Sequence, residues 1–150
     1  MVGIGYDSHR FAAGRRLVLG GVEIQHELGL AGHSDADVLT HAVIDAVLGA
    51  SGGGDIGTMF PDDDEQWRDA DSIDLLRTVV GTMAGPIINI DATLVCEQPR
   101  LGPYKAEMER TLAEATSARV SVKATSNEAM GWIGRGEGIA CIAVASVQSE

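Results

Sequence analysis

Val2-Gly3-Ile4-Gly5-Tyr6-Asp7-Ser8-His9 is the stretch that decides the fold of this chain, because it predicts a first strand against which other elements must pack. Alternate side chains of a strand leave the same face, so Asp7 and His9 point to the same side. These two side chains become neighbouring ligands of one metal ion only if a third ligand reaches them from across the core.

His41 is the candidate third ligand, and it lies on a helix predicted over about residues 36–50. The helix is indicated by apolar residues spaced three and four apart. His41 falls nearly opposite this apolar stripe, and Asp37 and Asp45 flank it one turn away, where they could orient its ring. The stripe consists of Leu39, Ala42, Val43, Ala46, Val47 and Ala50.

Asp7, His9 and His41 together offer one carboxylate and two imidazoles, a set that suits Zn²⁺. Three protein ligands with an open fourth position are typical of catalytic rather than structural zinc. The alternative interpretation is a capped turn, a histidine at the strand end and a helix histidine bonded to Asp37 or Asp45. Asp-x-His pairs are common on protein surfaces, so the spacing alone leaves both interpretations open.

The composition describes a small acidic protein, and its 150 residues predict one domain over residues 1–150. The formal net charge of −11 disfavours non-specific nucleic-acid binding. An anionic substrate would therefore need local cations or metal ions. Cys96 and Cys141 form no C-x-x-C pair, and there is no signal sequence or membrane-length apolar stretch. These features favour a location in the cytoplasm.

The remaining pattern alternates strands with helices and predicts an α+β fold, an α/β sandwich with a small mixed sheet and helices on one face. The other face of the sheet needs a cover, and with so few helices a partner subunit is expected. Ser34 or Asp35 is predicted to cap the helix that carries His41. The further predicted elements are a strand pair over 17–24 around the Gly20-Gly21 turn, a loop over 29–32, a mobile glycine loop over 51–57, a helix over about 72–84 capped by Asp71, a strand over 87–96, a helix opened by Pro103, a short strand over 120–123, a helical turn within 126–131 and a strand over 138–147.

Two polar loops in the first half of the chain are further binding candidates. His33-Ser34-Asp35 leads into the predicted helix, where free backbone N–H groups bind anions, although an ordinary helix cap has the same appearance. Asp55 and Asp62 could accept hydrogen bonds from a polyol. The sequence Asp62-Asp63-Asp64 is equally typical of a solvated acidic loop.

Two more candidates lie near the C-terminus. Thr125-Ser126-Asn127-Glu128 offers hydroxyl donors and one carboxylate able to hold Mg²⁺, although its Thr and Glu also have the spacing of a capping box. The glycine-rich segment 131–138 could bring Arg135 onto a phosphate, or it could be only a flexible surface turn. The sequence contains no dinucleotide fingerprint, P-loop or G-x-S-x-G motif.

Taken together, these segments resemble one family, the 2-C-methyl-D-erythritol 2,4-cyclodiphosphate synthases of the non-mevalonate isoprenoid pathway. The resemblance spans essentially the whole chain in order. It rests on Gly5-Tyr6-Asp7-Ser8-His9-Arg10-Phe11, Leu19-Gly20-Gly21-Val22, Gly32-His33-Ser34-Asp35-Ala36-Asp37 to His41, Gly54-Asp55-Ile56-Gly57, Phe60-Pro61-Asp62-Asp63-Asp64, Ala70-Asp71-Ser72, Lys123-Ala124-Thr125 and Gly134-Arg135-Gly136-Glu137-Gly138-Ile139-Ala140.

The resemblance implies a homotrimer whose sheets face the three-fold axis and whose active sites lie between adjacent subunits. It implies one Zn²⁺ per subunit on Asp7, His9 and His41, and Mg²⁺ or Mn²⁺ on Glu128. The implied reaction starts from 4-diphosphocytidyl-2-C-methyl-D-erythritol 2-phosphate. Its 2-phosphate attacks the β-phosphate within the same molecule, and CMP is released.

Two residues, His33 and Ser126, match the positions that stabilise the transition state in the family. The implied substrate-binding residues are Asp7, His9, His33, Ser34, Asp55, Ile56, Gly57, Phe60, Pro61, Asp62, Asp63, Asp64, Pro99, Arg100, Leu101, Gly102, Pro103, Ala124, Thr125, Ser126, Asn127, Glu128, Trp132 and Arg135. Residues 99–103, with Ala124 and Thr125, would line the cytidine pocket. Departures from the family pattern, which bear on nucleotide contacts and rate, occur at Arg100, Gly102, Ser126, Asn127 and Trp132.

Two other functions remain open on the residues themselves. A phosphoester hydrolase could use the same metal ligands with a bound water, and Asp37 or Asp55 could serve as its general base. A non-catalytic oligomeric scaffold would need the glycine-rich loops only as turns.

Overall fold

A mixed five-stranded sheet is the centre of the computed structural model, which describes residues 1–149. Its strand order is β4-β1-β7-β5-β6, in which only β5 and β6 are parallel. A separate hairpin joins β2 to β3 around the predicted Gly20-Gly21 turn. The strands are β1 (Val2–Ala12), β2 (Leu17–Leu19), β3 (Val22–Ile24), β4 (Gly29–Leu30), β5 (Ile87–Val95), β6 (Arg119–Thr125) and β7 (Gly138–Val147).

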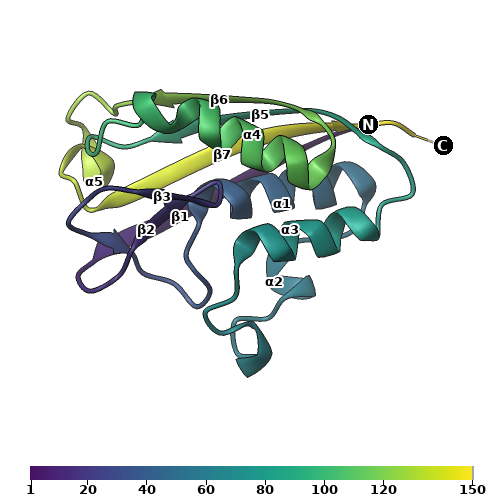
Figure 1. Ribbon diagram of the computed structural model, residues 1–150, viewed down its shortest axis with the longest axis horizontal. Helices are drawn as coiled ribbons and strands as arrows, with labels where there is room; N and C mark the ends of the chain where they lie inside the picture. Colours follow the sequence, from purple (N-terminus) through teal and green to yellow (C-terminus); the bar gives the residue numbers. More distant parts are fainter. Residues whose placement is uncertain (150) are drawn as a thin grey trace.

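The helices cover one face of this sheet, as the α+β prediction requires. Figure 1 shows α4 lying along β5 and β6, with α1 and α3 side by side and the two termini at the same end of the molecule. Within residues 1–149, no helix combines the length and the apolar character that crossing a membrane would need. The helices are α1 (Val38–Ser51), α2 (Ile56–Met59), α3 (Ser72–Gly81), α4 (Lys105–Thr116) and α5 (Gly131–Gly134), with 3-10 turns η1 (Glu65–Trp67) and η2 (Gly102–Tyr104).

The closest packing in the core joins α1 to β1. A Cβ atom on Gly5 would lie 1.9 Å from the carbonyl oxygen of Ala42, and Gly3 meets the helix backbone in the same way. Because no side chain fits between them, the helix backbone lies directly on the strand. This close approach brings His41 of α1 to the end of β1 that carries residues 7–9.

The prediction that Ser34 or Asp35 caps α1 is wrong, because Asp37 is the capping residue. Its carboxylate is fully buried, and burial raises its pKa, with a further increase from the charge of Asp35. Its two oxygens accept hydrogen bonds from the N–H groups of Gly20, Gly21 and Thr40 and from the Thr40 hydroxyl. Asp37 thus ties the helix to the β2–β3 turn, and this full set of bonds leaves it unsuited to act as a general base.

We expect Asp37→Ala to lower the free energy of unfolding by roughly 3–5 kcal/mol, because it removes a buried cap and leaves several donors unsatisfied. Urea denaturation followed by circular dichroism measures the change. Asp71→Ala is the matched control, since Asp71 caps α3 through one bond to Ile73 in a more exposed place, and about 1 kcal/mol is expected there. Equal losses of unfolding free energy in the two variants would contradict the larger contribution expected from the buried cap.

Several short elements differ from the sequence-based prediction. The predicted loop over 29–32 contains β4, which pairs with the end of β1. The predicted mobile glycine loop over 51–57 contains the start of α2, which the Asp55 side chain caps. The helical turn lies at residues 131–134 rather than within 126–131, and α3 ends at Gly81 rather than at residue 84. Two of these differences involve a partner in another element, since β4 pairs with β1 and the N–H of Ile56 in α2 bonds the Asp45 carboxylate of α1.

The opposite face of the sheet carries an apolar patch that no other part of the described chain covers. Its residues are between 38% and 70% exposed. The strand register places Ile4 opposite Val144 and Tyr6 opposite Ile142, so the side chains form a continuous surface. We call this surface the apolar patch; it consists of Val2, Ile4, Tyr6, Ile142 and Val144.

Candidate metal centre and active-site pockets

Asp7, His9 and His41 converge as the sequence predicts. Asp7 Oδ2 lies 2.8 Å from His9 Nε2 and 3.1 Å from His41 Nδ1. The two ring nitrogens are 3.3 Å apart. Ligand atoms that bind a tetrahedral zinc ion at about 2.0–2.1 Å are themselves roughly 3.3 Å apart, so the spacing fits such an ion closely.

The hydrogen bonds around the two imidazoles decide which nitrogens face the centre. His9 Nδ1 lies 2.8 Å from the carbonyl oxygen of Ala31, which can only accept, so His9 Nδ1 carries the hydrogen. His41 Nε2 lies 2.8 Å from the Ser72 hydroxyl, which itself donates to Asp35. His41 Nε2–H therefore donates to Ser72, and both remaining ring nitrogens present lone pairs to the centre.

Three electron-pair donors thus meet at one point and need a positive charge between them. Burial alone would raise the pKa of Asp7, but the hydrogen bonds and positive charge that His41 and His9 supply when protonated outweigh this and hold that pKa at about 2. Burial alone would lower the pKa of His41, but the hydrogen bond and the charge of Asp7 raise it. A proton on an imidazole can balance the cluster, and a divalent cation fits the same donor set. The described residues form no other cluster of three or more potential ligands of this kind.

The expectation that Asp37 or Asp45 orients His41 is wrong. Asp37 is occupied as the cap of α1, and Asp45 accepts a hydrogen bond from the N–H of Ile56 at 2.7 Å. The orienting groups come instead from other elements, because the inward side of a buried helix faces its tertiary neighbours rather than its own next turn. They are Ser34, Asp35 and Ser72, none of which the sequence singled out for this role.

A cavity of about 350 Å³ opens beside the metal centre. His33 and Ser34 line it with His9 and His41 of the candidate metal centre, so the structure brings these predicted residues together. Trp67 and Leu75, which the sequence did not indicate, also contribute to its wall. We call it the diphosphate cavity, after the group that the family resemblance predicts here; it is lined by His9, Gly32, His33, Ser34, His41, Ile56, Gly57, Phe60, Asp62, Trp67 and Leu75.

Two of the remaining acidic candidates near this cavity, Asp55 and Asp64, have structural partners. Asp55 accepts hydrogen bonds from Thr58, which lower its pKa while its side chain stays fully exposed. Asp64 caps the turn η1 and is bonded to Gln66. Asp63 lies on the outer side of the loop, and neither it nor Pro61 lines the diphosphate cavity.

A second cavity of about 620 Å³ collects the residues expected to bind cytidine. All of 99–103 line it, together with Ala124, Thr125 and Ser126 from the end of β6. Cys96, Glu97 and Lys105 were not predicted and also line it. We call it the nucleotide cavity.

The turn that carries Glu128 is held in an uncommon backbone conformation. Glu128 and Ala129 have φ angles of 52° and 59°, in the left-handed region that side chains disfavour. One carboxylate oxygen of Glu97 accepts hydrogen bonds from the N–H groups of Asn127 and Ala129, which holds this turn in place. The capping-box alternative is not found, since Ser126 Oγ bonds Glu128 N and no helix begins at residue 126.

Trp132 and Arg135 lie apart from both cavities described above. Trp132 lines a third cavity of about 660 Å³ with His9, Arg10 and Glu137. Arg135 is paired with Glu137 at 2.7 Å. Neither residue lines the diphosphate or the nucleotide cavity in a single chain.

The diphosphate and nucleotide cavities share no lining residue. His33 belongs to the first and Ser126 to the second, so one chain does not bring these two predicted catalytic residues into one pocket. Within one chain, the two cavities are therefore separate pockets.

Comparisons with known proteins point to the same family over nearly the whole chain. The model of the YgbB family matches residues 1–148. A 2-C-methyl-D-erythritol 2,4-cyclodiphosphate synthase of Symbiobacterium thermophilum is 53% identical, with 98% of both chains covered. The synthase of the same name from Salinibacter ruber is also 53% identical and covers 99% of this chain and 98% of its own.

Solved structures agree with this fold. The bifunctional IspDF of Campylobacter jejuni superposes with a TM-score of 0.92 at 40% identity, covering 96% of this chain and 41% of its own. The IspF of Plasmodium falciparum in its CDP complex gives a TM-score of 0.83 at 28% identity, over 99% of this chain and 96% of its own. The chain therefore belongs to the YgbB family, together with the 2-C-methyl-D-erythritol 2,4-cyclodiphosphate synthases.

Proposed function

We propose that this protein converts 4-diphosphocytidyl-2-C-methyl-D-erythritol 2-phosphate to 2-C-methyl-D-erythritol 2,4-cyclodiphosphate and CMP. The observation that carries the proposal is the Asp7–His9–His41 centre at the wall of the diphosphate cavity, in a chain of this family. An oxygen of the 2-phosphate attacks the β-phosphorus, the bond from that phosphorus to the bridging oxygen breaks, and the bridging oxygen leaves with CMP. No covalent enzyme intermediate is needed, so positioning and charge neutralisation are the tasks of the protein.

The residues of the chain divide these tasks. When bound, Zn²⁺ at Asp7, His9 and His41, with Mg²⁺ or Mn²⁺ at Glu128, would polarise and neutralise the diphosphate. His33, at the wall of the diphosphate cavity, donates to the developing charge on the phosphoryl oxygens. Ser126 performs the same role from the nucleotide cavity.

Substrate binding is divided between the same two cavities. The methylerythritol end contacts residues 55–57 and 60–64, as well as Ser34, in and around the diphosphate cavity. Cytidine enters the nucleotide cavity, whose walls include residues 99–103, Ala124 and Thr125. A relative in this family has been solved as a CDP complex, which supports a cytidine nucleotide as ligand. Asn127 completes the site together with Trp132 of α5 and Arg135, which directly follows that helix.

The separation of the two cavities favours a homotrimer in which the diphosphate cavity of one subunit meets the nucleotide cavity of the next, so that each supplies half of one active site. The apolar patch supports this arrangement, because an uncovered apolar face of a sheet is typical of an interface. In a trimer with the sheets facing the three-fold axis, three patches cover one another. We also expect the protein in the cytoplasm, in keeping with its two buried free thiols.

We expect Ile142→Glu to convert the trimer to monomers, because it places a charge at the centre of the apolar patch. Light scattering at micromolar concentration gives the mass directly. Thr78→Glu makes the same charge change on the exposed side of α3 and should leave the mass unchanged. A wild-type monomer, or a trimeric Ile142→Glu protein, would contradict this arrangement.

Product analysis tests the reaction and separates it from hydrolysis. Purified protein is incubated with the cytidyl substrate, Zn²⁺ and Mg²⁺, and the products are quantified by ³¹P NMR. Equal amounts of CMP and cyclic diphosphate are expected. Linear phosphorylated products would instead support a metal-dependent hydrolase, and no turnover would support a scaffold.

A further inference from the structure

We propose that Arg15 is a positioning residue that clamps the loop carrying His33 and thereby sets the rate of the reaction; this inference rests on the proposed function. Arg15 lies outside the set of residues predicted to contact substrate or metal. It follows β1 in the connection to the β2–β3 hairpin and is half-buried.

The guanidinium of Arg15 bridges two carbonyl groups on either side of His33. Its Nη1 donates to the carbonyl of Gly32 and its Nη2 to that of Ser34, each at 2.7 Å. The intervening carbonyl of His33 accepts a hydrogen bond from the N–H of Asp69 at 3.1 Å. Three consecutive carbonyl groups of one irregular loop are thus held, two of them by a single side chain.

This loop contacts the site at three points. The side chain of His33 lines the diphosphate cavity, and the Ser34 hydroxyl lies 3.0 Å from His41 Nε2. The loop also packs tightly on the first zinc-ligand histidine, since a Cβ on Gly32 would come within 3.1 Å of the His9 ring. Residues 31–37 belong to no helix or strand, so these contacts depend on bonds from outside the loop.

The chemistry of this place requires arginine rather than another cation. Its planar fork carries two donors that can reach two carbonyl groups at once, whereas a lysine ammonium is a single point. Acidic residues, including Asp35, Asp62 and Asp69, line the cavities beside Arg15. Even so, none of the salt bridges found within residues 1–149 includes Arg15, so its two bonded donors serve the backbone of the loop.

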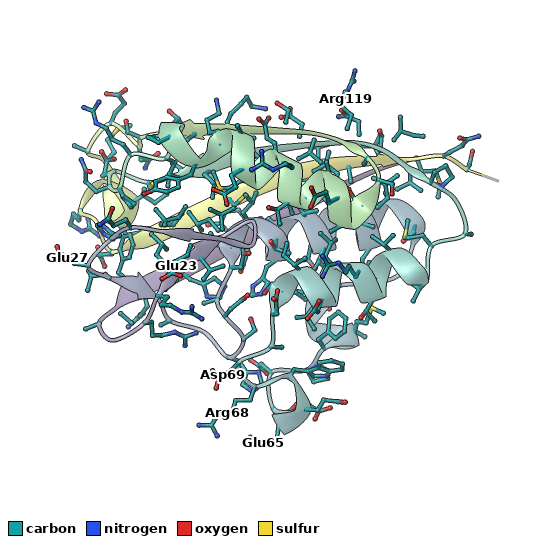
Figure 2. The ribbon with its side chains drawn as sticks, in the orientation of Figure 1. Glu23, Glu27, Glu65, Arg68, Asp69 and Arg119 are labelled. Carbon is teal, nitrogen blue, oxygen red and sulfur yellow. The ribbon has the colours of Figure 1, made fainter. Side chains whose placement is uncertain are left out.

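The outer side of the clamp is open to solvent. Figure 2 shows Glu65, Arg68 and Asp69 projecting outward from the segment between α2 and α3. The N–H of Asp35 donates to the carbonyl of Ala70 at 3.1 Å, so this segment supports the loop through its backbone, while its own cation, Arg68, pairs with Glu65. Arg15 is the group that joins the loop to the β1–β2 connection.

The test compares Arg15→Ala and Arg15→Lys with Arg16→Ala. Arg16 is the adjacent, exposed arginine, and its guanidinium pairs with Glu23 at 3.5 Å. We expect Arg15→Ala to lower kcat roughly 10–100-fold, with KM, zinc content and trimer mass nearly unchanged, because small displacements of a catalytic group reduce the rate by such factors. Arg15→Lys should recover only part of the loss, and added guanidinium below denaturing concentrations should raise kcat in Arg15→Ala alone. Amide hydrogen exchange over residues 31–36 should become faster in Arg15→Ala than in Arg16→Ala.

Each outcome decides the proposal. Unchanged kcat in Arg15→Ala, or equal losses in Arg15→Ala and Arg16→Ala, would refute it. A lowered kcat that Lys restores fully would assign the effect to charge and refute the clamp. If Arg15→Ala does not fold, Arg15→Lys decides by the same measurements. If the wild-type protein forms no cyclic product, the proposed function fails. The clamp is then tested separately by amide hydrogen exchange: equal exchange over residues 31–36 in Arg15→Ala and Arg16→Ala would refute it.

Discussion

His41→Ala is expected to remove stoichiometric zinc and to lower kcat/KM by roughly a thousandfold or more, the largest effect of any single change on the site. The reason is that His41 is the only one of the three ligands contributed by α1. Without it, Asp7 and His9 remain on one strand and offer only two donors. Zinc content measured by elemental analysis and product formation measured by ³¹P NMR check the two effects together.

His26→Ala is the matched control for this experiment. His26 packs against Phe11 with ring centroids 5.6 Å apart and is not part of the metal cluster. We expect its zinc content and activity to equal those of the wild-type protein. Retained zinc with unchanged activity in His41→Ala would refute the ligand assignment.

Gly5→Ala is expected to lower the free energy of unfolding by about 3 kcal/mol or more, although it adds a single methyl group. The new Cβ would lie 1.9 Å from the Ala42 carbonyl and 2.7 Å from the Ala46 N–H nitrogen. Both obstacles are helix backbone and cannot rotate away as a side chain could, so α1 must move off β1. Urea denaturation measures the loss.

The displacement of α1 should also weaken the metal centre. Ala42 directly follows His41, so a shift of this helix moves Nδ1 of His41 away from Asp7. We expect lower zinc affinity in refolded Gly5→Ala than in the wild-type protein. Gly81→Ala provides the control, because Gly81 has open space around its Cβ position and ends α3; it should be neutral or slightly stabilising. A Gly5→Ala protein as stable as Gly81→Ala would contradict the packing argument.

The long elements of the fold could be predicted from the sequence, whereas the short ones could not. The helix around His41 and the final strand carry apolar patterns long enough to exclude alternatives, and both are found at nearly the predicted positions. β4 and α2 have two and four residues, too few for any periodicity. Their backbones are fixed by partners distant in sequence: Phe11 and Ala12 pair with β4, and the Asp45 carboxylate bonds the first residue of α2.

The candidate site likewise contains residues that the sequence predicts and residues that only the fold brings together. Residue types and spacing proposed Asp7, His9 and His41, and the resemblance to a family directed attention to His33, Ser126 and the loops around them. The sequence assigned the orienting role to Asp37 and Asp45 because they lie one turn from His41. The groups that perform it are Ser34, Ser72 and Asp35, which reach His41 through folding rather than helical spacing.

The sequence by itself determined the fold class, the pair of ligands on one strand and the family to which the chain is similar. These depend on strand and helix periodicity and on ordered motifs, which are local properties. The tertiary structure alone decided that the glycines of β1 bring α1 close enough to complete the donor set. It also decided the ring nitrogens that face the centre, the Arg15 bonds to the loop and the separation of the two cavities. These features depend on distances between atoms far apart in the chain, which no local pattern specifies.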